Sequence, residues 1–170
     1  MSLGKSNSNY SKLAMLFHWG FVILFAYGVA KQVEDLNQLD DFDFFKFEIT
    51  FAFIFLFLLT IRFIYMKRTQ SSSLPPETPK VQKIAAKFVH NSMYVLLSAT
   101  VLSGLLIGLL YWLEFKDGII INSIIIIHEL VINILYLFIG IHIIAATYHR
   151  FKKDGVWSSM VPFLKEKKLK

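Results

Sequence analysis

The chain has 170 residues, of which 55% are hydrophobic and 18% are charged, and its formal net charge is +6. Apolar runs as long as those below exceed what a soluble core absorbs, so the composition indicates a membrane protein. The basic residues gather beside the apolar runs, which argues against nucleic acid as a partner. The absence of cysteine excludes disulfides, thiolate-bound metals, iron–sulfur clusters and covalently attached haem.

Four apolar stretches are each long enough to cross a bilayer, which needs about 20 residues in a helix. The first begins at Leu13 after a polar lead-in of residues 1–12, and a cleaved signal peptide is the alternative interpretation of it. An acidic loop, a loop rich in proline and serine, and a very short loop separate the four stretches. We expect the spans at about 13–32, 44–66, 84–113 and 119–149, followed by a basic cytoplasmic tail at 151–170.

Loop charge predicts how the spans are oriented. The lead-in, the loop at 67–87 and the C-terminal tail are basic, whereas the loops after the first and third spans are acidic. Because basic loops stay on the cytoplasmic side, both termini are expected in the cytoplasm. The predicted fold is an all-α membrane protein, an up-down-up-down bundle of four transmembrane helices. No internal repeat or second domain is evident, so residues 1–170 are expected to form one membrane domain.

Two histidines stand out in the fourth span. His128 and His142 are fourteen residues apart, nearly four helical turns, so they share one face about 21 Å apart along the axis. Ionisable side chains inside a span are costly and indicate a functional site. Hydrogen bonding between helices is the alternative explanation.

Topology converts residue number into depth. His18 lies near the start of the first span and His142 near the end of the fourth, so both are expected close to the cytoplasmic surface. Two histidines at one depth on different helices can bind one haem iron from both sides, as in electron-transfer b haems. His18 and His142 are therefore candidate ligands of an inner haem.

The outer half of the bundle offers a less regular pair. His128 is a candidate metal ligand near the outer surface, and the second span places Glu48 at the same depth. Glutamate is a poor axial ligand for ferrous haem, because anionic oxygen favours the ferric state. Three alternatives stay open: an outer haem bound by His128 with or without Glu48, no outer haem, or a Glu48–His128 polar pair.

Three further residues are candidates for contacts with a cofactor. Arg62, near the end of the second span, could pair with a haem propionate or extend to the cytoplasmic interface. His90 and His149 both lie near the cytoplasmic surface, where either could hydrogen-bond a quinone headgroup or a propionate. A solvated interfacial histidine is the plainer interpretation of each.

Across roughly residues 10 to 165 the chain resembles the bacterial cytochrome b561 family, related in layout to b-type subunits of hydrogenases and formate dehydrogenases. The residues that carry the resemblance are Phe17-His18-Trp19, Thr60-Ile61-Arg62, His90 at the start of the third span, His128-Glu129 and Gly140-Ile-His142. The resemblance implies two b haems held by four histidines. Glu48 stands where the family has the fourth histidine, and the loop after the third span is shorter than is typical.

The resemblance also implies a function. It predicts a multi-pass protein of the bacterial inner membrane, surrounded by lipid, that exchanges electrons between ubiquinone or menaquinone and an outer donor or acceptor. Some members exchange electrons with superoxide; others serve soluble dehydrogenases or c-type cytochromes, so a periplasmic redox protein or a second subunit is an expected partner. Quinone-linked oxidoreductase activity is left open. The alternatives are an electron-relay subunit of a larger complex and a haem-free metal or proton transporter.

Overall fold

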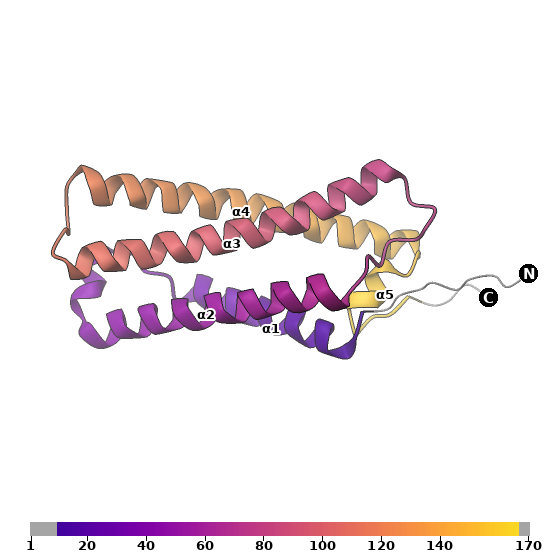
Figure 1. Ribbon diagram of the computed structural model, residues 1–170, viewed down its shortest axis with the longest axis horizontal. Helices are drawn as coiled ribbons and strands as arrows, with labels where there is room; N and C mark the ends of the chain where they lie inside the picture. Colours follow the sequence, from indigo (N-terminus) through magenta and orange to yellow (C-terminus); the bar gives the residue numbers. More distant parts are fainter. Residues whose placement is uncertain (1–9, 167–170) are drawn as a thin grey trace, which may run out of the picture.

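The computed structural model describes residues 10–166 and contains four long helices that lie side by side and alternate in direction (Figure 1). Their bounds are α1 Lys12–Ala30, α2 Phe42–Thr69, α3 Lys80–Trp112 and α4 Ile119–Lys152. A short 3-10 helix, η1 Leu36–Asp40, precedes α2, and α5 Val156–Met160 follows α4. All four long helices are long and apolar enough to cross a membrane. The predicted four-span bundle is confirmed; residues 1–9 of the predicted lead-in and 167–170 of the tail lie outside the described residues.

The helices differ from the predicted spans mainly at their ends. α3 begins four residues before the expected span, and α2 extends to Thr69 rather than 66. The predicted spans stop at charged residues. The helices continue past them, because charged side chains are tolerated where a helix extends beyond the hydrocarbon. At the start of α2 the Asp41 carboxylate accepts the backbone N–H groups of Asp43 and Phe44 at 2.9 and 3.2 Å. This cap begins the helix two residues earlier than expected.

Most side chains of the bundle face outward, as expected for helices that lipid surrounds. Ile126, Ile143 and Ile144 are each more than half exposed, and they are typical of a long series of exposed large apolar residues. The buried centre is small and consists of Phe21, Phe55 and Leu59. Since the helices are apolar on all sides, burial of apolar side chains is not what selects their inward faces.

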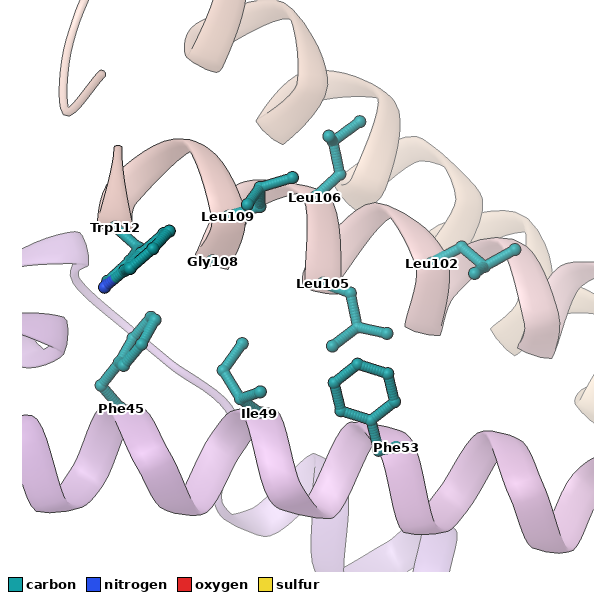
Figure 2. A pocket seen from close by; sticks show the side chains of 9 residues that line it. All are labelled: Phe45, Ile49, Phe53, Leu102, Leu105, Leu106, Gly108, Leu109 and Trp112. Carbon is teal, nitrogen blue, oxygen red and sulfur yellow. The ribbon is translucent and has the colours of Figure 1, made fainter. Parts of the chain in front are cut away.

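Two glycines in α3 allow neighbouring helices to approach closely. A Cβ atom at Gly104 would lie 3.3 Å from the His128 ring of α4, and one at Gly108 would lie 2.6 Å from Ile49 Cδ1 of α2. Beside Gly108, an apolar groove of about 500 Å³ lies between α2 and α3, with Phe45, Ile49 and Phe53 facing α3 (Figure 2). Its lining is almost entirely apolar, so it suits hydrocarbon such as a lipid chain.

The ends of the bundle differ in charge. The loops 31–41 and 113–118 lie at one end and contain more acidic than basic residues, so we call it the acidic end. The loop 70–79 and α5 lie at the other end, which we call the basic end because Lys67, Arg68, Lys80 and Lys83 flank that loop. At the basic end the Trp19 indole donates to the Met160 carbonyl at 3.2 Å, which ties α5 to α1. α3 packs closely on both α2 and α4, whereas α1 packs on α2 and α5 and is not closely packed on α4.

A hydrogen-bonded cluster closes the acidic end. Asp40 accepts hydrogen bonds from the Tyr111 hydroxyl and from the Lys116 ammonium, the latter at 3.0 Å, so η1 is joined to α3 and to the loop that follows it. The Tyr111 hydrogen bond and then the Lys116 hydrogen bond hold the pKa of Asp40 below its ordinary value. The ionised carboxylate is therefore the form that holds this end together.

We expect Asp40→Asn to lower the thermal unfolding temperature of the detergent-solubilised protein at neutral pH. A carboxyl whose pKa is depressed on folding stabilises the protein above its unfolded pKa of about 3.9 and loses that contribution as pH falls further. The difference between the variant and the wild type should therefore shrink below about pH 4. Asp117→Asn is the matched control, since the Asp117 side chain makes no hydrogen bond or ion pair within residues 10–166. Equal effects of the two substitutions would contradict the role given to Asp40.

Candidate functional site

Three histidines from three helices gather in the half of the bundle near the basic end. The ring centres of His18 in α1 and His142 in α4 are 6.2 Å apart, at an interplanar angle of 61°. His90 of α3 is also close to His142, with ring centres 5.0 Å apart. The structure thus brings together His18 and His142, and it adds His90 as an immediate neighbour. We call this group the basic-end site.

Arg62 of α2 turns into the bundle beside these histidines rather than out to the interface. Its guanidinium carbon lies 5.5 Å from the ring centre of Phe21 and 5.2 Å from that of Tyr94, and its Nη2 lies 3.4 Å from His18 Nδ1. Arg62 Nε is buried without a hydrogen-bond partner, and no carboxylate pairs with Arg62 within the described residues. A partly buried cation without an anion is costly, so this geometry favours an anionic group in the site.

His90 and His149 have different environments. His90 Nδ1 donates to the Ala86 carbonyl at 2.7 Å, which leaves the Nε2 lone pair available. His149 Nδ1 lies 2.6 Å from a carboxylate oxygen of Asp154, and Lys152 contacts the same oxygen at 3.5 Å. The His149 side chain is therefore joined to the segment between α4 and α5. Its contacts fit a structural role better than the predicted contact with a cofactor.

A separate cavity of about 750 Å³ lies toward the acidic end, and both His128 and Glu48 line it. Its walls come from all four long helices and from the loop after α1. His128 Nδ1 lies 2.7 Å from Ser103 Oγ of α3. The Glu48 carboxyl has no hydrogen bond or ion pair within residues 10–166. We call this group the acidic-end site.

Residues 9–163 match the family described as prokaryotic cytochrome b561. The chain belongs to this family. Searches of curated proteins and of solved structures gave no match. The protein is thus a multi-pass membrane b-type cytochrome, and its haem b carries electrons.

The basic-end site of this cytochrome b561 fits a haem iron with two protein ligands. Two imidazoles on opposite sides of one iron have ring centres roughly 6 Å apart, because a metal–nitrogen bond is about 2 Å and the ring centre lies about 1 Å beyond. The 6.2 Å between His18 and His142 matches this separation, whereas the 5.0 Å between His90 and His142 is too short. Of the two histidine pairs at this site, His18 and His142 therefore have the separation that an iron between them would require.

A haem needs fewer ligands from the protein than a bare metal ion does. Within residues 10–166 no group of three or more His, Cys, Asp or Glu side chains is placed to hold a metal ion. A haem iron takes only its axial ligands from the protein, since the porphyrin supplies the other four. Two histidines are therefore enough at the basic end.

Sequence reasoning missed several contacts around the two sites. Tyr94 and Phe21 enclose the Arg62 guanidinium, Ser103 holds the His128 ring, and Trp19 links the helix of His18 to α5. Ser103 could have been found, because the antiparallel arrangement of the third and fourth spans gives it about the depth of His128. The enclosure of Arg62 could not, since aromatic residues occur on every side of these helices.

For a haem bound between His18 and His142, we expect Arg62→Gln to lower the midpoint potential. Removing a nearby cation makes electron uptake less favourable, by an amount on the order of 50 mV, close to a tenfold change for one electron. A spectroelectrochemical redox titration of the purified protein measures the change. Arg62→Lys keeps the charge and should shift the potential less. An unchanged or raised potential in Arg62→Gln would mean that this cation does not act on the haem.

Proposed function

We propose that this cytochrome carries electrons between a membrane quinone at its basic end and a redox partner at its acidic end, through a haem that His18 and His142 hold. The observation that carries the proposal is the 6.2 Å separation of these two rings beside an Arg62 without a carboxylate partner. A haem held by two imidazoles, one from α1 and one from α4, would leave the iron no free position for a substrate, which suits electron transfer.

Each residue of the basic-end site has a distinct part in this proposal. The bound haem supplies one-electron chemistry; the protein supplies its ligands, charge and orientation. His18 and His142 approach from two helices that are not packed closely on each other. Arg62 places a positive charge beside them and would pair with a haem propionate. His90 keeps its Nε2 lone pair free and its side chain is exposed on the surface of the chain, so it can accept a proton from a quinol hydroxyl.

Charge supports an orientation with the basic end in the cytoplasm. The 70–79 loop is flanked by Lys67, Arg68, Lys80 and Lys83, whereas the loops of the acidic end contain Glu34, Asp35, Asp40, Asp41, Glu114 and Asp117. We place the protein in the bacterial inner membrane, so its acidic end faces the periplasm. A soluble redox protein, a second subunit or superoxide would then exchange electrons with the protein on that side.

The two alternative functions make different demands on the structure. A metal transporter needs a set of ligands for a bare ion, and none is placed within residues 10–166. A buried layer of Phe21, Phe55 and Leu59 also separates the two groups of ionisable residues. An apolar layer of this kind suits cofactors on either side of it better than a path for an ion. A relay subunit within a larger complex would use the same haem and differ only in its partner.

We expect His142→Ala to remove one haem per chain, because the iron loses one of its two protein ligands. The measurement is a pyridine haemochrome assay scaled to protein concentration, after size-exclusion chromatography has shown that the variant is folded. His149→Ala is the control: it lies two turns farther along α4, and its ring contacts Asp154 instead. A full haem complement in His142→Ala would refute the assignment.

The orientation can be tested because the chain has no cysteine of its own. Asp117 at the acidic end and Ser71 at the basic end are both exposed positions in loops. We expect a membrane-impermeant maleimide added to spheroplasts to label Asp117→Cys at once and Ser71→Cys only after the membrane is permeabilised. The reverse pattern would place the basic end outside.

A further inference from the structure

The cavity of the acidic-end site is large enough for a cofactor. Its volume of about 750 Å³ lies within the range of about 300–1,000 Å³ that is usual for cofactor sites. Residues of α1, α2, α3 and α4 form its walls, and the loop segment from Gln32 to Leu36 lies at its outer edge. The cavity therefore extends from the interior of the bundle toward the solvent at the acidic end.

The His128 ring has the protonation pattern of a metal ligand. The Ser103 hydroxyl has a single hydrogen, and its contact with the Ala99 carbonyl at 2.6 Å uses it. Ser103 Oγ must then accept from His128 Nδ1, 2.7 Å away, so Nδ1 carries the proton and Nε2 carries the lone pair. Metal-binding histidines are held by such a hydrogen bond at their second nitrogen. Gly104 leaves the ring room against α3, because a Cβ atom there would come within 3.3 Å of it.

A second imidazole is missing from the cavity. His128 is the one histidine among the described residues that line it, and Glu48 contributes a carboxyl group from α2. The other acidic residues at the lining are Glu34, Asp35 and Glu129. α2 and α4 are not closely packed on each other, so Glu48 and His128 belong to different walls of the cavity. The donor set therefore does not fit an iron with two histidine ligands, but it fits one with a single histidine.

We infer that the cavity binds a haem through His128 alone, and that Glu48 leaves the other side of the iron open to a small diatomic ligand that enters from the acidic end. This inference rests on the proposed function, since it adds a second haem to the one at the basic end. A carboxyl group beside an open coordination position can hydrogen-bond a small polar ligand and is a weak ligand for ferrous iron itself. The acidic-end haem would then bind ligands, whereas the basic-end haem only transfers electrons.

The experiment uses the purified full chain, with carbon monoxide as the probe. Wild-type protein should contain two haems per chain by pyridine haemochrome assay. After dithionite reduction, carbon monoxide should change the absorption spectrum of about half of the haem, and the oxidised protein should show a high-spin signal by electron paramagnetic resonance. Glu48→Gln should keep all three properties, because it also leaves one side of the iron open.

Two variants test the His128 ligand and the open coordination position separately. Glu48→His should keep two haems but lose both the carbon monoxide response and the high-spin signal, since a second imidazole would occupy the open coordination position of the iron. His128→Ala should contain one haem and give no carbon monoxide response. Because Glu48→His adds a ligand and removes none, it tests the inference even where His128→Ala fails to fold.

Other outcomes overturn the inference and show whether the proposed function falls with it. A wild-type protein with two low-spin haems that do not bind carbon monoxide would mean that Glu48 or another group occupies the remaining coordination position of the iron. A single haem that His142→Ala removes and His128→Ala keeps would leave the basic-end site intact and refute the acidic-end haem. A protein with no haem at all would refute both.

Discussion

Hydrocarbon offers no hydrogen bonds, and this constraint decides where the ionisable side chains of the four helices lie. His18, His142 and Arg62 point to one another in the half near the basic end, and His128 and Glu48 line a cavity in the other half. Between them the bundle is filled by apolar side chains. The bundle thus has two polar centres separated by apolar side chains. This arrangement suits transfer of electrons, which can cross an apolar layer, better than transport of ions, which cannot.

Arg62 shows most clearly that the helices alone do not complete the site. Its guanidinium is enclosed by aromatic rings, one of its nitrogen atoms has no hydrogen-bond partner, and no acid is paired with it. Contact with aromatic faces recovers only about 0.5–2 kcal/mol of the cost of removing a cation from water. A haem propionate would supply the missing anion and would place the porphyrin beside the two histidines. Arg62 and the histidine pair therefore point to the same cofactor for independent reasons.

The sequence predicted the number of spans and their order, because the length of the apolar stretches reports directly on both. Matched depth was enough to select His18 and His142 as neighbours. The direction in which each side chain points was not predictable, since helices that are apolar on every side carry no pattern that marks the inward face. That limit explains why the interior position of Arg62 and the contact between His90 and His142 came only from the structure.

Local hydrogen bonds were the second limit. The cap at Asp41 set the start of α2, and the cluster around Asp40 set the position of η1, yet neither feature follows from hydropathy. Glu48 is a contrasting example. Its depth and its departure from the family pattern could be seen in the sequence, but the cavity that it shares with His128 could not, because the space between helices depends on how closely they pack.

The two proposed ligands of the basic-end site, His18 and His142, lie on the first and the last of the long helices. A ribosome delivers α1 to the membrane well before α4, so His18 must stay without its counterpart until nearly the whole chain has been synthesised. Under this proposal, haem would bind at the basic-end site only after α4 has been synthesised. Once in place, the porphyrin would join the two ends of the chain across a pair of helices that pack poorly on each other. A chain truncated before α4 would lack His142 and so would have no means of retaining haem at this site, which makes haem retention there a marker for the presence of α4.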